Sequence, residues 1–322
     1  MKLIIQIPCF NEEHTLPQTV ADIPRQIQGV DQVEILVIDD GSTDRTVDVA
    51  KAIGVDYVVC NKHNLGLART FRRGIDESLR RGADIIVNTD GDNQYCGADI
   101  SKLVEPILAG RADMVIGDRR TEQIEHFSKG KKLMQRLGSG VVRKLAGIAV
   151  PDTVSGFRAF SRDVAIQINI VSPYSYTIET VIQAGKRDIA VESIPVRTNP
   201  MTRESRLFRS IPSFIGRQMA TILRMYAMYQ PLRVFFLIGT VLIAAGMLPI
   251  LRFLYFYLVG AGDGHLQSLV LGGVLVLMGY VAYIAGLLAD LISFNRQLTE
   301  MTLERVKRIE HCLEVSSRSD DR

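Results

Sequence analysis

The sequence predicts an α/β fold with a mostly parallel sheet, followed by two transmembrane helices. Within the first 233 residues, short apolar runs alternate with longer amphipathic segments. That alternation is typical of a parallel sheet with helices on both faces. The stretch 234–289 contains only two charged side chains, Arg252 and Asp263, and its length suits two membrane crossings.

Short apolar runs predict the strands, and the segments between them predict the helices. The helical patterns have apolar residues at helical spacing, as expected of helices that cover a sheet. In such sheets, ligands bind at the carboxyl ends of the strands. The predicted strands are 3–7, 35–38, 57–59, 85–87 and 114–116, and the predicted helices are 15–28, 43–53, 66–81 and 98–109.

Polar residues follow three of these strands at the point where each strand ends. They occupy 8–12, 39–44 and 90–94, and they include several carboxylates. Because parallel strands end at one edge of a sheet, these carboxylates would repel one another without a compensating cation. Mg²⁺ or Mn²⁺ holding a diphosphate would compensate them. The alternative is an ordinary turn, since Asp, Gly and Asn are common turn residues and an isolated D-x-D is a weak motif.

Two uncharged runs, 234–251 and 266–289, are predicted to form a transmembrane hairpin with a short polar turn. A bilayer core needs about 20 apolar residues in helical form. The alternative is a buried helical pair in a soluble core. Small residues in the spans predict close helix packing and a homo-oligomer. They are Gly239, Gly246, Gly272, Gly273 and Gly279.

Basic residues flank the two spans and are missing from the turn between them. Because positive charge marks the cytoplasmic side, both termini and the first 206 residues are expected in the cytoplasm. The start at Met1 shows no signal-peptide pattern, and the four cysteines lack C-x-x-C spacing, as expected of a reduced compartment. The flanking residues are Arg203, Arg206, Arg209, Arg217, Arg224 and Arg233, then Arg296, Arg305, Lys307 and Arg308.

Composition divides the chain into four predicted parts and limits its partners. We expect a catalytic domain over 1–206, an amphipathic interfacial segment over 207–233, a transmembrane hairpin over 234–289, and a cytoplasmic helix and tail over 290–322. The net charge of +3 is too small to predict nucleic acid as a partner. The arginines before the first span suit anionic lipid headgroups better.

Seven motifs together resemble a known enzyme family. "IPCFNEE", "VIDDGSTDRT", "NLGLART" and "DGDNQY" are similar to the nucleotide-sugar-binding half of the family 2 glycosyltransferases, which have the GT-A fold. "VIGDRR", "DTVSGFRAF" and "IPVRTN…ESRLF" resemble the polyprenyl-phosphate sugar synthases, of which dolichyl-phosphate mannose synthase is the best-known type. The resemblance covers about residues 3–210.

The resemblance implies donor-site roles for the residues that match the motifs. The nucleoside would lie against Pro8, Phe10, Glu12 and Asp39, with Asp40 and Ser42 supporting that loop. Asp90 and Gly91 would approach the ribose and the diphosphate. Asp92 and Gln94, with Asp90 beside them, would hold Mg²⁺ or Mn²⁺. The family more often has "DADLQ" here, so Gly91 and Asn93 depart from its pattern.

The resemblance also implies cationic residues for the phosphate of the acceptor lipid. Arg119 matches an arginine of the family, and Lys132 and Arg206 fall at two further basic positions. Lys129, Lys131 and Arg136 are rivals to Lys132. For all of them the alternative is an exposed surface charge. Glu179 falls where the family has an acidic residue near the sugar, so it would orient a sugar hydroxyl; the alternative is an ordinary helix-surface glutamate. We take Asp92, Arg119 and Glu179 as the candidate catalytic residues.

The implied reaction is metal-dependent transfer of a sugar, with inversion, from a UDP- or GDP-linked donor to undecaprenyl or dolichyl phosphate. Three alternatives stay open. A processive polysaccharide synthase would carry Q-x-x-R-W, but the chain has no tryptophan. Another membrane lipid could be the acceptor, although a neutral hydroxyl would need a catalytic base. A non-catalytic lipid-binding scaffold would lack transfer altogether.

Overall fold

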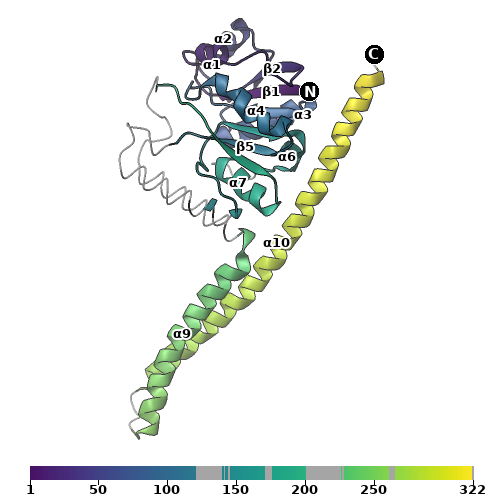
Figure 1. The fold of residues 1–322 in the computed structure, drawn as a ribbon. Helices are drawn as coiled ribbons and strands as arrows, with labels where there is room; N and C mark the ends of the chain where they lie inside the picture. Colours follow the sequence, from purple (N-terminus) through teal and green to yellow (C-terminus); the bar gives the residue numbers. More distant parts are fainter. Residues whose placement is uncertain are drawn as a thin grey trace. The chain divides into compact units, whose positions relative to one another are not determined.

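The structure is a computed structural model, and it describes residues 1–120, 146–170, 176–200, 228–260 and 265–320, with 140, 142, 143 and 226. The chain divides into two compact units, one of residues 1–209 with 304–322 and the other of 210–303. The first unit contains a seven-stranded sheet in the order β3-β2-β1-β4-β6-β5-β7. Figure 1 shows this unit with β1, β2 and β5 labelled. The strands are β1 (Lys2–Cys9), β2 (Gln32–Asp39), β3 (Tyr57–Cys60), β4 (Ile85–Asn88), β5 (Met114–Asp118), β6 (Arg158–Ser161) and β7 (Val191–Pro195).

Strands β3, β2, β1 and β4 are parallel, and this part of the sheet confirms the predicted α/β class. β6 is antiparallel to both β4 and β5, and neither β6 nor β7 was predicted. The helices of this unit are α1 (Leu16–Ala21), α2 (Thr46–Ala52), α3 (Leu67–Arg80), η1 (Gly97–Asp99), α4 (Ile100–Leu108), α6 (Arg162–Gln167) and α7 (Tyr176–Lys186). The helix expected over 15–28 ends at Ala21, since Pro24 disfavours helical backbone just before it.

Helices cover both faces of the sheet. On one face, alternate β1 side chains such as Leu3 and Ile5 join a buried core with Leu16 of α1 and Leu103 of α4. On the other face, α3 packs so closely that a Cβ on Gly74 would lie 2.8 Å from Ile38 Cδ1. Burying these apolar faces is the main favourable term in folding. This packing also fixes the positions of the strand ends from which the polar loops begin.

In the second unit, α9 (Pro231–Leu258) packs against α10 (Leu266–Asp320), a single helix that continues into the first unit. Both helices are long and apolar enough to cross a membrane, with a mean hydropathy of 2.5 over an 18-residue stretch of α9 and 2.1 over one of α10. Large apolar side chains such as Leu248 and Leu277 are 69% and 65% exposed. Exposure of this kind favours lipid-facing helices over a buried soluble pair.

Glycines bring α9 and α10 into backbone contact. A Cβ on Gly246 would lie 2.8 Å from the carbonyl oxygen of Gly272, and one on Gly239 would lie 2.8 Å from that of Gly279. These four glycines therefore act inside the hairpin. A Cβ on Gly273 would meet nothing within 4 Å. The homo-oligomer stays a prediction.

The end of β1 closely approaches the loop after β4. A Cβ on Gly91 would lie 2.9 Å from the Sγ atom of buried Cys9 and 3.5 Å from the carbonyl oxygen of Pro8. The thiol therefore takes the space that a methyl group at position 91 would need. Where the family pattern has alanine at this position, Cys9 gives a physical reason for glycine in this chain.

We expect Gly91→Ala to lower the free energy of unfolding by about 1–3 kcal/mol, because the added methyl overpacks the site. Cys9→Ala frees that space, so the double variant should recover at least about 1 kcal/mol relative to additivity. Denaturant unfolding in detergent, followed by circular dichroism, measures both effects. Gly273→Ala is the matched control because its new methyl has open space. Strictly additive losses would contradict this account.

Candidate active site

The loop after β4 brings the three predicted metal residues together. Asp90, Asp92 and Gln94 are all partly buried, and the Asp92 Oδ1 atom accepts a hydrogen bond of 3.2 Å from the backbone N–H of Gln94. Asn93 between them has a φ of +55°, in the left-handed region, which Asn tolerates better than most residues. The loop is thus a tight turn that presents two carboxylates and one carboxamide.

The loop after β2 is closed by Asp39, whose side chain is 2% exposed. Its Oδ2 atom accepts hydrogen bonds of 3.1 Å from the backbone N–H groups of Gly41 and Ser42. The Oγ atom of Ser42 accepts a bond of 2.8 Å from the N–H of Asn11, after β1. Ser42 therefore joins two of the loops that carry predicted donor residues.

Asp40 holds a further loop in place. It is 4% exposed and accepts hydrogen bonds from the side chain of Asn61 at 2.8 Å and from the N–H groups of Leu65 and Gly66 at 2.9 Å each. Backbone amides stabilise a carboxylate strongly in a buried place. Asp40 thus shapes the "NLGLART" segment where it enters α3.

Glu12 lies beside the loop after β4. It is 8% exposed, and its Oε2 atom accepts a hydrogen bond of 2.7 Å from Thr15 Oγ1. The same hydroxyl lies 2.8 Å from the carbonyl oxygen of Gly91. Pro8 is buried within β1, opposite Ile38 of β2. Phe10 is partly buried in the loop that follows.

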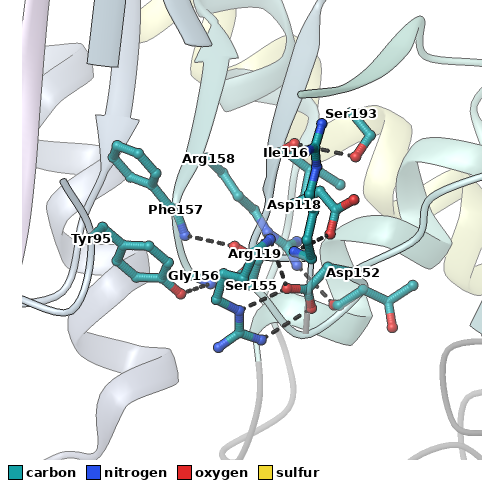
Figure 2. Close-up of polar contacts among 12 residues, drawn as sticks. Tyr95, Ile116, Asp118, Arg119, Asp152, Ser155, Gly156, Phe157, Arg158 and Ser193 are labelled. Atoms are coloured by element: carbon teal, nitrogen blue, oxygen red, sulfur yellow. Dashed lines mark hydrogen bonds and ion pairs between the residues drawn. The ribbon is translucent and has the colours of Figure 1, made fainter. Parts of the chain in front are cut away.

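Arg119 follows β5 and is held by Asp152 (Figure 2). Its Nε atom lies 2.7 Å from Asp152 Oδ2, and its Nη2 atom lies 3.0 Å from Oδ1. This two-pronged geometry fixes the plane of the guanidinium group. The side chain of Arg119 is 12% exposed and that of Asp152 is 2% exposed, so the alternative of a freely solvated Arg119 is wrong.

The "DTVSGFRAF" segment supplies further residues that the sequence prediction did not single out. Gly156 lies against the loop after β4, residues 90–95, which we call the donor loop, since a Cβ there would be 2.8 Å from Asp90 Oδ2. The N–H group of Gly156 donates a bond of 3.0 Å to the hydroxyl of Tyr95 (Figure 2). The motif resembles that of the polyprenyl-phosphate sugar synthases, but sequence alone shows neither the close contact nor which of its side chains are buried.

Arg158 of β6 is fully buried and was also missed. Its guanidinium group donates to the carbonyl oxygens of Ser155 at 2.7 Å, Thr153 at 2.9 Å and Thr177 at 2.7 Å, and to the hydroxyl of Thr180. All four acceptors are neutral. Burial therefore lowers the pKa of Arg158 to about 10.

Glu179 lies in α7 and is 1% exposed, so its interpretation as a helix-surface glutamate is wrong. Gln183 of the same helix donates to its Oε1 atom at 3.5 Å. The sugar-orienting role stays a prediction. Lys132 and Arg206, like the rivals Lys129, Lys131 and Arg136, lie outside the described residues.

The donor loop concentrates negative charge. Burial, together with the charges of Asp92 and Glu12, raises the pKa of Asp90 to about 7. Within the described residues, no group of three or more His, Cys, Asp or Glu side chains is placed to hold a metal ion. The oxygen donors of Asp92 and Gln94 do suit Mg²⁺ or Mn²⁺ in an open site that substrate phosphates complete.

Three comparisons place this geometry among known proteins. An uncharacterized protein of Methanocaldococcus jannaschii is 32% identical over 206 residues, which cover 61% of this chain and 81% of the relative. The polyprenol monophosphomannose synthase of Mycolicibacterium smegmatis is 27% identical over 206 residues, which cover 61% of this chain and 76% of that relative.

A crystal structure of glucosyl-3-phosphoglycerate synthase from Mycobacterium tuberculosis, in complex with Mn²⁺, UDP and glucosyl-3-phosphoglycerate, has a TM-score of 0.56. It is 22% identical, covers 69% of this chain and 79% of that chain, and so supports the GT-A fold alone. The glycosyl transferase family 2 model matches residues 4–168, just over half of the sequence. The chain therefore belongs to glycosyl transferase family 2.

Proposed function

We propose that this glycosyltransferase moves a sugar from a nucleotide-diphosphate sugar to a polyprenyl phosphate, with Mg²⁺ or Mn²⁺ and with inversion at the anomeric carbon. The observation that carries the proposal is the contact between the acidic donor loop and the segment that holds Arg119. A Cβ on Gly156 would lie 2.8 Å from Asp90 Oδ2, and Asp152, a few residues earlier, binds Arg119. This proximity supports a phosphate-binding role for Arg119 beside a metal-binding role for the loop after β4.

The donor half of the proposal rests on the three polar loops. Pro8, Phe10, Glu12 and Asp39 would bind the nucleoside, and the backbone of Gly91 would approach the diphosphate. Asp92 and Gln94, with Asp90 beside them, would hold the divalent ion. When bound, that ion would offset the negative charge on the departing diphosphate.

The acceptor half rests on charge. A phosphate acceptor and a diphosphate donor repel each other, so cations must lie where they meet. Two nitrogens of Arg119 bind Asp152, and its Nη1 atom has no hydrogen bond to any described residue. This third nitrogen would contact the acceptor phosphate, with Lys132 and Arg206 as further candidates, and Glu179 would orient the sugar.

The reaction would be one in-line displacement. An acceptor phosphate oxygen forms a bond to the anomeric carbon, while the bond from that carbon to the diphosphate breaks and its electron pair leaves with the nucleoside diphosphate. A phosphate monoester has a second pKa of about 6, so it is largely ionised near neutral pH and needs no strong base. A single attack inverts the anomeric configuration, which NMR of the product would test.

The lipid acceptor is supported by the two apolar helices and by the name of the mycobacterial relative, a polyprenol monophosphomannose synthase. Undecaprenyl and dolichyl phosphate present the same phosphate group. The basic flanks of the spans support a cytoplasmic catalytic domain, with an interfacial segment over 207–233 and both termini on the same side.

Purified protein in detergent should transfer label from one UDP- or GDP-linked sugar to polyprenyl phosphate when Mn²⁺ or Mg²⁺ is present. Asp92→Ala should reduce kcat/KM at least about 100-fold, or ~2.7 kcal/mol, because a metal ligand is lost. Asp48→Asn, an exposed carboxylate on α2, should leave the rate unchanged. Transfer to a neutral lipid alone would contradict the proposed phosphate acceptor. Nucleotide binding without any transfer would favour the alternative of a non-catalytic scaffold.

The raised pKa of Asp90 predicts a pH-dependent stability of the metal-free protein. With a folded pKa of about 7 against an ordinary aspartate value of 3.8, the native state binds more protons between those two values. The free energy of unfolding should therefore fall as pH rises from about 4 to about 7. Asp90→Asn should flatten this dependence and Asp48→Asn should not, as measured by denaturant unfolding. An unchanged slope in Asp90→Asn would contradict the assignment.

Loss of the charge on Asp152 should weaken acceptor binding, because the orientation of Arg119 depends on the ion pair. We expect Asp152→Asn to raise the KM for polyprenyl phosphate about 10-fold or more, with donor affinity within about twofold. Glu105→Gln removes an exposed carboxylate from its pair with Arg111 and is the matched control. An unchanged acceptor KM would contradict the role of Arg119.

A further inference from the structure

The segment that follows β7 pairs with the donor loop. The backbone N–H of Cys96 donates to the carbonyl oxygen of Arg197 at 3.2 Å, and the N–H of Asn199 donates to the carbonyl oxygen of Gln94 at 2.9 Å. An antiparallel bridge joins Tyr95 to this segment between those two bonds. The segment after β7 therefore forms a short antiparallel pairing with the loop that carries the proposed metal ligands.

The side chain of Asn199 reaches further into the same loop. Its Nδ2 atom lies 3.2 Å from both the carbonyl oxygen and the Oδ1 atom of Asn93, and 3.3 Å from the carbonyl oxygen of Tyr95. It also lies 3.3 Å from the Oδ2 atom of exposed Asp22. Two backbone carbonyls and a carboxylate accept only, so the amide nitrogen, not the oxygen, must point toward them.

These contacts centre on the residue with unusual backbone. Asn93 has a φ of +55° and separates Asp92 from Gln94. A left-handed conformation at a non-glycine residue carries a cost and persists where neighbours hold it. The internal bond from Gln94 to Asp92 and the external bonds from Asn199 supply that support.

Asn199 is itself anchored by an ion pair between the exposed side chain of Arg197 and the buried carboxylate of Asp99. The backbone N–H of Arg197 donates to the Oδ2 atom of Asp99 at 2.7 Å, and its Nη2 atom lies 2.8 Å from Oδ1. Asp99 is fully buried. Although burial acts to raise it, the hydrogen bonds from Arg197 and Lys102 lower the pKa of Asp99 to about 2. The ion pair therefore fixes the backbone of the segment that carries Asn199.

We propose that Asn199 is a positioning residue that holds the turn at Asn93, so that Asp92 and Gln94 point to one divalent ion. This inference rests on the proposed function for its ligand, but not for its geometry. Asn199 also lies a few residues before Arg206, in the part of the sequence where the acceptor residues are expected. One short segment would therefore support the donor loop and lead into the acceptor segment.

Hydrogen exchange on the full-length protein in detergent, without metal or nucleotide, tests the geometry. Asn199→Asp puts an acceptor against several acceptors, and Asn199→Ala removes the donor. Both should speed amide exchange in the peptide 92–99 at least about 10-fold, or ~1.4 kcal/mol, while the β1 peptide is unchanged. Asp22→Ala removes only the contact outside the loop and should match the wild type. Unchanged exchange in both Asn199 variants would overturn the proposal.

Calorimetric titration with UDP and with GDP, each with Mn²⁺ or with EDTA, tests the positioning role. Asn199→Asp should lose about 10-fold of the affinity that Mn²⁺ adds, while affinity in EDTA stays within about twofold. Equal losses in both conditions would mean a merely structural residue, and no loss in either would mean no role; each overturns the proposal. If Mn²⁺ adds nothing to nucleotide affinity in the wild type, the proposed function fails, whereas exchange still decides whether Asn199 holds the loop.

Discussion

The parallel register of β1 with β2 and with β4 is the constraint on which the site depends. Cys9 lies opposite Asp39, and Gln6 lies opposite Asn88, so these strands end at one edge of the sheet. Carboxylates from three separate loops must therefore share a small volume. Like charges so placed raise one another's pKa unless each finds a donor or a cation.

Hydrogen bonding sorts these carboxylates into two groups. Asp39 and Asp40 accept bonds from backbone N–H groups and serve to shape loops. Asp90 lacks that compensation in the described residues, and its pKa is raised to about 7. The uncompensated charge thus lies in the loop after β4, where a bound divalent ion would be stabilised most.

Positive charge on the other side of this loop is arranged in two ways. Arg119 is paired with a carboxylate, so its position is fixed at little net charge. Arg158 is buried among neutral oxygens, so its charge is not cancelled by its hydrogen-bond partners. A buried cation that keeps its charge acts over a longer range in a low dielectric. Its charge, like that of Arg119, acts to lower the pKa of Asp90.

Much of the sheet could be predicted from sequence because its first five strands are short apolar runs between amphipathic helices. The strand β6 could not, since "RAFS" begins with an arginine, and only burial among four oxygens makes Arg158 compatible with a core strand. Asp90, Asp92 and Gln94 could be predicted as a group because they are close in sequence. Asp152, Gly156 and Asn199 were not singled out, because their partners lie far along the chain and only folding brings them together.

The donor loop is held from several directions before any substrate binds. The hydroxyls of Thr15 and Thr19 lie 2.8 Å and 3.3 Å from the carbonyl oxygen of Gly91 on one side, and Asn199 donates to carbonyl oxygens on the other. A loop of free carboxylates would spread to reduce repulsion, and substrate binding would then have to reorder it. Neutral donors bound to carbonyl oxygens restrain the backbone without cancelling carboxylate charge. The fold can therefore keep these negative side chains together for a cation while leaving their charge available to bind it.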